Sequence, residues 1–274
     1  MIITLTSDLG MRDHYVASVK AALLTLAPDV SIVDISHQVR PFDIHEAAFL
    51  VRSVWQQFPI GTVHIIGINP EYNTQQIHVA VHYMGHYFVC ADNGMFSLLF
   101  DEVPQDIFEL TLTHDADFNF PMRGAFATAA AHLCKGGSPE FLGKRISALK
   151  QTPPKLPQTE HDLIKGHVQY IDHYGNVYTN ITRQIFDAVS ASRSFAIHFK
   201  KAGYAISTIS HYFHDVIEGE RLAMWAHNDC LMLAINGGAP DNGGGAADLF
   251  GLKKDDIIRI EFHGNPHSEN DIQE

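Results

Sequence analysis

Short apolar strands alternate with helices in the first half of the chain, and this order constrains the fold more than any other feature. Residues 2–6 (IITLT) predict a buried strand, and apolar residues at helical spacing follow through residues 15–26. A strand at 30–35, a helix at 44–57 and an apolar strand at 62–68 continue the pattern. Repeated strand–helix–strand units predict a parallel sheet with helices on both faces, a doubly wound α/β domain.

The pattern changes further along the chain. Residues 76–82 and 86–91 flank a glycine-containing connection that is typical of a hairpin, and an Ala-rich helix is expected at 125–135. The segment QTPPKLP then places three prolines in a short polar stretch. We therefore expect an α/β domain at 1–150, a Pro-rich linker at 151–162 and a second domain at 163–274.

The second domain shows little helical periodicity. Short apolar segments separated by turns predict strands at 166–171, 194–199, 221–226, 231–235 and 257–262. This domain is expected to be mostly β.

Composition excludes several classes of protein. Aspartate and glutamate outnumber lysine and arginine by 31 to 19, and no dense basic stretch is present to bind phosphate backbones, so nucleic acid is not expected as a partner. No long apolar run or N-terminal leader indicates a membrane segment, and we expect a cytoplasmic protein. Three widely spaced cysteines in apolar context suit reduced core thiols. The 18 histidines do not form a recognisable zinc motif, so we expect no metal.

Four loops follow directly from predicted strands and are candidates for a ligand site, at 7–13, 36–43, 68–74 and 91–94. The first lacks the glycine pattern of a dinucleotide site and offers Asp8, whose carboxylate would repel a pyrophosphate but can accept hydrogen bonds from ribose hydroxyls. A nucleoside without phosphates fits this loop better. The alternative for Asp8 is a helix N-cap. Phe42 could stack on a nucleoside or belong to the core.

Five segments taken together resemble the S-adenosyl-L-methionine (SAM) hydroxide adenosyltransferase family, to which fluorinases and chlorinases are related. They are residues 6–16 (TSDLGMRDHYV), 32–37 (IVDISH), 41–46 (PFDIHE), 91–94 (ADNG) and 170–181 (YIDHYGNVYTNI). The resemblance runs in one order from residue 2 to about residue 262. It implies a doubly wound first domain, a small C-terminal β-barrel and a homotrimer whose sites are shared between neighbouring subunits.

The resemblance also assigns roles to individual residues. Asp8 would accept the ribose hydroxyls, and Phe42 and Phe120 would enclose the sugar and the reacting carbon. Asp172 would pair with the methionine ammonium. The alternative for Asp172 is an ordinary Asn/Gly turn. The adenine side would be contacted by Tyr174, Asn176 and Tyr212. In the implied reaction, water or hydroxide attacks C5′ of SAM and yields adenosine and methionine.

The chain departs from the family where water is activated. Hydrolytic members carry an Asp, an Arg and a His, and this chain has Asn69, Gln76 and Pro121 at those positions. Asn69 and Gln76 can hold a water but cannot take a proton near neutral pH. Glu71 or His78 could substitute as a base, with a solvated loop carboxylate and a strand histidine as the alternatives.

Two further replacements concern the methionine tail and the halide. His227 and Asn228 lie in a turn that contains a serine in the family, beside a lengthened loop at 242–245, which bears on recognition of the amino-acid tail. Met122 stands where fluorinases have a serine, so halogenation is not predicted.

Two hypotheses for the function follow from the resemblance and the departures from it. The first is an enzyme that hydrolyses SAM, and the second is a non-catalytic protein that binds adenosine or SAM.

Overall fold

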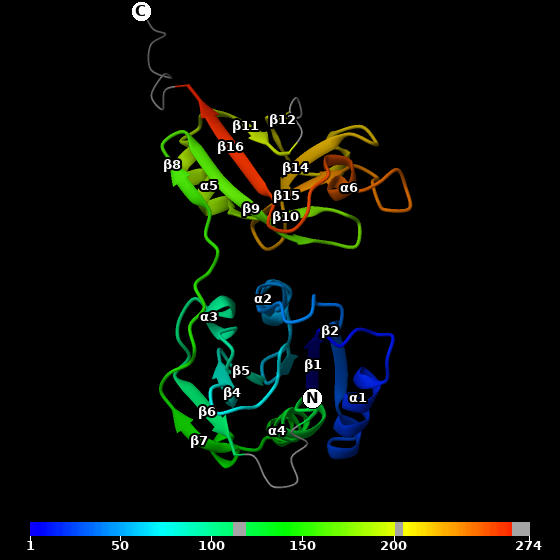
Figure 1. The fold of residues 1–274 in the computed structure, drawn as a ribbon, viewed down its shortest axis with the longest axis vertical. Coiled ribbons are helices and arrows are strands. Elements are labelled where there is room, and N and C mark those ends of the chain that lie inside the picture. The colour runs from blue at the N-terminus through cyan, green and yellow to red at the C-terminus, as the bar shows by residue number, and fades with distance from the viewer. Residues whose placement is uncertain (112–118, 201–204, 265–274) are drawn as a thin grey trace, which may run out of the picture. The chain divides into compact units, whose positions relative to one another are not determined.

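A computed structural model describes residues 1–111, 119–200 and 205–264 of the chain. The chain divides into two compact units, Met1–Pro154 and Lys155–Glu274 (Figure 1). The division falls inside the proline-containing stretch 151–162. The Thr152 N–H donates a hydrogen bond to Ser97 Oγ within the first unit. Residues Gln158–Glu160 form a short strand of the second unit.

A seven-stranded sheet forms the centre of the first unit, in the order β2-β1-β3-β5-β4-β6-β7. The strands β2, β1, β3 and β5 are parallel, and the others pair antiparallel. The bounds are β1 Ile2–Ser7, β2 Ser31–Ser36, β3 Val63–Gly67, β4 His78–Tyr83, β5 His86–Ala91, β6 Asp106–Leu110 and β7 Gly143–Ile146. β1 and β3 are buried along nearly their whole length, as strands covered on both faces must be.

Helices cover both faces of this sheet, which confirms the doubly wound fold. On one face α1 (Tyr15–Leu26) and α4 (Ala127–Cys134) pack on β1, β3 and β5. On the other, α2 (Ile44–Arg52) and α3 (Phe96–Leu99) form a second cluster with Trp55 and Phe88. Short 3-10 turns lie at Trp55–Gln57 and Pro139–Phe141, and a π-helical turn, Met122–Phe126, precedes α4.

The expected hairpin is present, with Tyr83 paired to His86 across Met84 and Gly85. Both turn residues have positive φ (48° and 79°), the conformation of a tight two-residue hairpin turn.

A curved, mostly antiparallel sheet forms the second unit, in the order β12-β11-β16-β9-β10-β15-β14-β13, with β8 beside β9. The bounds are β8 Gln158–Glu160, β9 Leu163–Ile171, β10 Val177–Thr182, β11 Ser194–His198, β12 Ala205–Ile206, β13 Ile209–Ser210, β14 Arg221–Trp225, β15 Cys230–Ile235 and β16 Ile257–His263. One core of buried residues from all of the long strands fills its interior, giving a nearly closed barrel. The predicted C-terminal β-barrel is confirmed.

Several elements differ from the sequence-based expectation. The helix α5 (Arg183–Ser190), capped by the Thr182 side chain, was not expected in a domain with little helical periodicity. A further short helix, α6, spans Ala246–Phe250, and a 3-10 turn spans Phe213–Asp215. The predicted helix at 44–57 ends at Arg52, because Ser53 begins a turn that leads into the 3-10 segment.

The described part of the chain contains no helix with the length and apolar character needed to span a bilayer. All three cysteines are buried, and none of them forms a disulfide.

Candidate functional site: the carboxyl edge of the parallel strands

The carboxyl ends of the four parallel strands meet at one edge of the first unit. β1 ends at Ser7, β2 at Ser36, β3 at Gly67 and β5 at Ala91. The antiparallel strand β4 begins at this same edge, because its first residue, His78, pairs with Ala91. Loops after parallel strands leave backbone groups free for ligands, and this is where α/β sheets bind them.

Asp8 and Phe42 are brought together at this edge, although they lie far apart in the sequence. Oδ2 of Asp8 accepts a hydrogen bond from the Phe42 backbone N–H at 2.8 Å. Among the described residues no donor reaches the other oxygen, Oδ1. Asp8 does not cap α1, since the N-cap residue of that helix is His14, which excludes the alternative role. The half-buried carboxylate thus keeps one oxygen available to a ligand.

Phe42 presents its ring to solvent. Its backbone has φ +66°, an unusual conformation for a non-glycine residue, and its side chain is 72% exposed. The bond from Phe42 to Asp8 stabilises this strained backbone. An aromatic ring held exposed in the loop between β2 and α2 is available for stacking and makes no contribution to the core.

A chain of polar side chains lies directly beneath Asp8. Ser7 Oγ is 2.7 Å from His37 Nδ1, and both residues are buried. On the other side of the ring, His37 Nε2 is 3.1 Å from Asp34 Oδ1, and Lys20 contacts the second Asp34 oxygen at 2.5 Å. Burial acts to raise the pKa of Asp34, but the bonds from Lys20 and His37 outweigh it and leave that pKa lowered. Asp34 is therefore ionised near neutral pH.

The loop between β3 and β4 is held by Gln76. Its side-chain Nε2 donates to the backbone oxygens of Asn69 (2.8 Å) and Glu71 (2.7 Å). Asn69 has φ +45°, so the chain turns sharply directly after β3. Gln76 thus shapes the loop that carries Asn69, and its amide nitrogen is committed to the backbone.

His78 is buried next to this loop. Nε2 donates to Pro70 O at 2.8 Å, which leaves Nδ1 as an acceptor, and no described residue donates to it. Burial lowers the pKa of His78, and the bond to Pro70 offsets this only in part. His78 is therefore neutral near pH 7.

Phe120 and Pro121 lead into the π-helical turn on the face of α1. The Phe120 ring meets Tyr15 edge-on at 5.7 Å, and the Arg123 guanidinium lies 5.9 Å from its centre. Pro121 precedes the turn and accepts a bond from the Phe126 N–H through its carbonyl. Met122 fills the space beside Gly67, where an added Cβ would overlap its sulfur. The turn therefore places an apolar thioether against the end of β3.

In the second unit, Asp172 orders the connection between β9 and β10. Oδ1 accepts from the N–H groups of Tyr174 and Asn176 at 2.9 Å each, and Oδ2 accepts from Asn176 Nδ2 at 2.9 Å and Tyr178 OH at 3.4 Å. A carboxylate offers about four acceptor positions, so this turn uses them all. Burial, together with the adjacent Asp172, raises the pKa of Tyr178 to about 12.

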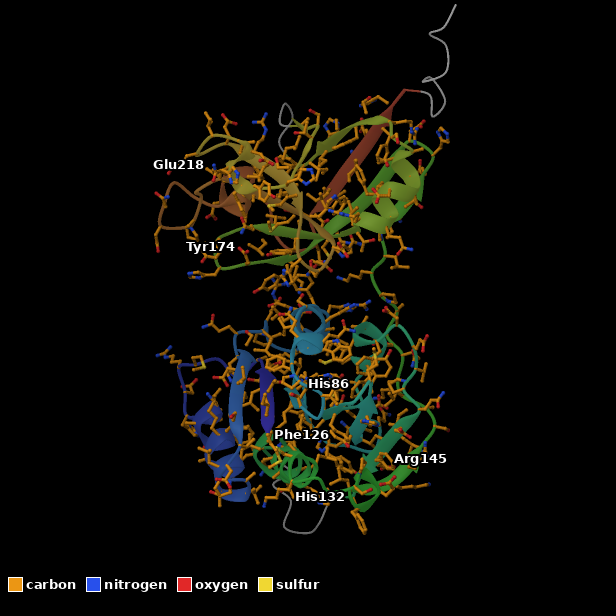
Figure 2. All side chains as sticks on the ribbon, turned by 180° about the vertical axis from the view of Figure 1, so that it is seen from behind. His86, Phe126, His132, Arg145, Tyr174 and Glu218 are labelled. Atoms are coloured by element: carbon orange, nitrogen blue, oxygen red, sulfur yellow. The ribbon has the colours of Figure 1, made fainter. Side chains whose placement is uncertain are left out.

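The remaining predicted binding residues of the second unit lie in exposed turns. Tyr174 is 61% exposed (Figure 2). Its backbone lies against the glycine-rich loop 242–245, where a Cβ added to Gly245 would overlap the Tyr174 carbonyl. Tyr212 is 62% exposed and stacks on His214 at 5.0 Å. His227 and Asn228 lie in the β14–β15 turn, which Asn228 closes by accepting from the Cys230 N–H.

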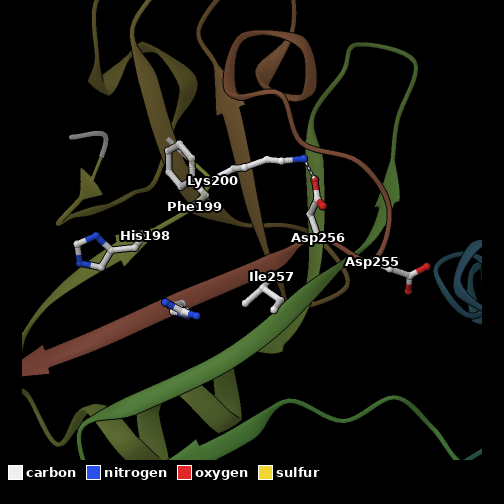
Figure 3. Close-up of a pocket in the computed structure, with 7 residues that line it drawn as sticks. His198, Phe199, Lys200, Asp255, Asp256 and Ile257 are labelled. Carbon is white, nitrogen blue, oxygen red and sulfur yellow. Dashed lines mark hydrogen bonds and ion pairs between the residues drawn. The ribbon is translucent and has the colours of Figure 1, made fainter. Parts of the chain in front are cut away.

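A separate hollow of about 420 Å³ lies between the end of β11 and the start of β16 (Figure 3). Three of its charged residues are already in ion pairs, Lys200 with Asp256 at 3.2 Å and Asp255 with Lys155 at 2.7 Å. Its lining includes none of the predicted site residues.

Sequence reasoning placed Asp8, Phe42 and Asn69 in loops at this edge, and the family resemblance added Gln76. The candidate loops 7–13 and 36–43 contain Ser7 and His37, but no role was predicted for either residue. The available signal was position, since Ser7 is the last residue of β1 and His37 follows directly after β2.

The fold and this edge define a two-unit α/β protein with a candidate ligand site at the carboxyl ends of its parallel strands. Residues 3–143 match the SAM hydroxide adenosyltransferase N-terminal domain, and residues 166–259 match the corresponding C-terminal domain. The chain therefore belongs to the SAM hydroxide adenosyltransferase family.

Individual relatives agree with this assignment. The (R)-S-adenosyl-L-methionine hydrolase of Thermus thermophilus is 30% identical over 267 residues, which cover 93% of this chain and 97% of the relative. A fluorinase of Nocardia brasiliensis is 30% identical over 216 residues, 66% of this chain and 71% of its own. The crystal structure of an uncharacterized conserved protein from Thermotoga maritima superposes with a TM-score of 0.84 at 28% identity, covering 95% of this chain and 99% of that one.

Proposed function

We propose that this protein hydrolyses SAM to adenosine and L-methionine. The observation that carries the proposal is the carboxylate of Asp8, whose Oδ2 is fixed by Phe42 N–H and whose Oδ1 has no donor within the described residues. A carboxylate held in this way accepts hydrogen bonds from a ribose diol, and its charge disfavours a phosphorylated ligand. Relatives that span nearly the whole chain are named (R)-S-adenosyl-L-methionine hydrolase.

The reaction requires little from the protein beyond positioning. The oxygen of water attacks C5′ of the ribose, the C5′–S bond breaks, and its electron pair returns to sulfur. Methionine leaves as a neutral thioether, adenosine gains the attacking oxygen as its 5′ hydroxyl, and one proton passes to solvent. Since the leaving group carries no negative charge, the step needs no acid to protonate it. SAM is the substrate, and no additional cofactor enters this proposal.

We further propose that Asn69 and Gln76 orient the attacking water. Gln76 holds the loop through its Nε2, which leaves its Oε1 as an acceptor beside Asn69. Neither side chain takes a proton near neutral pH, and Pro121 has no polar side-chain atom. The turnover number is therefore expected to be about a hundredfold or more below that of a relative with a general base.

The other contacts complete the proposed site. Phe42 and Phe120 enclose the sugar, Asp172 pairs with the ammonium group, and Tyr174, Asn176 and Tyr212 contact adenine. His227 and Asn228 lie nearest the carboxylate of the methionine tail. In this proposal the chain forms a homotrimer, and the second-unit residues of one subunit complete a site on its neighbour. The exposure of Phe42, Tyr174 and Tyr212 supports it.

Incubation of the purified protein with SAM, followed by chromatography of the products, tests the proposal. Adenosine and methionine are expected in equal amounts above a no-protein control. The variant Asn69→Asp is the matched test of the water site, because it changes one amide to a carboxylate of the same shape. It should raise turnover by roughly a hundredfold. No adenosine from either protein at any pH between mildly acid and alkaline would refute hydrolysis.

The second candidate is a non-catalytic protein that binds adenosine or SAM. Asn69, Gln76 and Pro121 favour it, because a binding protein needs no base at these positions. Calorimetric titration separates the two candidates: binding of SAM without release of adenosine supports the second, and absence of binding to both ligands rejects both.

A further inference from the structure

We propose that His37 is the residue that positions Asp8 for the ribose diol, acting through Ser7 from beneath the ligand edge. This inference rests on the proposed function, because it assigns a role at the same site. His37 itself is buried and would not touch the ligand.

The His37 ring lies between Ser7 and Asp34, and only its contact with Ser7 has the geometry of a hydrogen bond. Nε2 lies 3.1 Å from Asp34 Oδ1, which can only accept, so the tautomer with its hydrogen on Nε2 turns that hydrogen toward the carboxylate. Nδ1 is then an acceptor and receives the hydroxyl of Ser7 at 2.7 Å. Ser7 Oγ in turn accepts from the Leu9 N–H at 3.4 Å. Leu9 and Ser7 are the two chain neighbours of Asp8, so the ring fixes both of them.

Backbone bonds reinforce the same connection. The His37 carbonyl accepts from the Gly10 N–H at 2.6 Å, and the Ser7 carbonyl accepts from the Val39 N–H at 3.4 Å. The loop after β1 and the loop after β2 are therefore joined at His37 before they meet again at the bond between Asp8 and Phe42. Displacement of His37 would shift both partners of that bond.

Asp34 flanks the far side of the His37 ring. Its carboxylate is held by Lys20 of α1 at 2.5 Å and projects from β2, so the His37 ring is fixed between two strands and a helix. A small displacement of a side chain that contacts a ligand can cost about a hundredfold in activity, so a rigid support beneath Asp8 has a functional consequence.

A second histidine in the same sheet provides a matched control. His64 of β3 is also fully buried, and its Nδ1 lies 2.7 Å from the Thr4 hydroxyl of β1. The other ring nitrogen contacts His86 at 3.2 Å, near the start of β5 (Figure 2). This pair resembles Ser7 and His37 in chemistry and burial but lies toward the amino ends of the strands, away from Asp8.

The experiment compares two ligands, adenosine and 2′,3′-dideoxyadenosine, by calorimetry on the full-length chain. His37→Gln keeps a donor for Asp34 and removes the acceptor for Ser7, and it should weaken adenosine binding roughly tenfold. Ser7→Ala should do the same. His37→Asn keeps an acceptor at the Nδ1 position and should restore most of the affinity. None of the three should change binding of the dideoxy ligand.

The control variant His64→Gln should lower thermal stability without changing the ratio of the two affinities. In an Asp8→Ala background, His37→Gln should have no further effect on adenosine binding. If His37→Gln and Ser7→Ala keep the wild-type preference for the diol, or lose affinity for both ligands equally, the positioning role is wrong. If the wild type binds neither ligand, the proposed function itself has failed. A His37→Gln protein that does not fold leaves Ser7→Ala to decide.

Discussion

Asp8 and Asp172 are each placed directly after a strand, one in each unit, yet their carboxylates have opposite surroundings. Among the described residues, Asp8 accepts one hydrogen bond, from a backbone N–H 34 residues away in the sequence, and its second carboxylate oxygen stays available. Asp172 accepts four bonds, all from residues within six positions of it in the sequence. The first joins two loops at an open edge, and the second builds its own turn.

This difference shows that the position of a carboxylate at a strand end does not by itself make it a ligand contact. A carboxylate whose acceptor positions are filled by its own turn stabilises that turn, and a ligand ammonium would have to compete for it. The weakest of the four bonds, from Tyr178 OH at 3.4 Å, is the one that a ligand could replace at least cost.

Removal of the Asp8 side chain should have the largest effect. Asp8→Ala is expected to weaken adenosine binding about a hundredfold, because hydrogen bonds to a charged group contribute about 1.5–3 kcal/mol each and tenfold in affinity corresponds to about 1.4 kcal/mol. The unfolding free energy should fall by about 0.5–1.5 kcal/mol, because the hydrogen bond that holds the strained Phe42 backbone is lost as well. Calorimetric titration and thermal melts measure the two quantities, and unchanged affinity in a folded variant would contradict the assignment.

The same change at Asp172 should act on stability first. Asp172→Ala leaves the buried Asn176 amide without its acceptor and is expected to cost about 1–3 kcal/mol. This corresponds to a fall of several degrees in the melting temperature of the second unit. Asp172→Asn keeps one acceptor oxygen and should lose less. Equal melting temperatures for wild type and Asp172→Ala would show that the turn forms without this carboxylate.

The smallest expected effect concerns the tyrosine next to Asp172. The pKa of Tyr178 is raised from 10.0 to about 12, mainly by burial and then by the Asp172 charge. A raised pKa means that the folded state holds the proton more tightly. Tyr178 therefore contributes stability below pH 10 that is lost as the pH rises toward 12.

Ultraviolet absorbance of tyrosinate follows this titration. In the wild type, one tyrosine should ionise at a higher pH than the others. This step should be missing from the titration of the Tyr178→Phe variant. Removal of the charge in Asp172→Asn should lower the Tyr178 pKa only part of the way toward 10.0, since burial is the larger cause. A complete return to that value would show that the carboxylate, and not burial, controls this side chain.

Local pattern was sufficient for most of the fold. The apolar run at the start of the chain and the helical spacing after it identified β1 and α1, and the glycine at position 85 identified the hairpin. The sequence pattern failed where an element was short or where polar and apolar residues alternate irregularly on its face. The helix α5 is only eight residues long, so its period was hidden between strands. The strands β6 and β7 of the first sheet were missed in the same way.

The sequence by itself determined the alternating strands and helices at the start of the chain, the positions of Asp8 and Asp172 after strands, and the absence of an acid or base at Asn69 and Gln76. Only the tertiary structure decided which of these groups remain available. Periodicity reports the neighbours of a residue along the chain, whereas the hydrogen bonds between Ser7 and His37 and between Asp8 and Phe42 join residues 30 and 34 positions apart. Parallel pairing of β1 with β2 brings them together, and no local pattern carries that information.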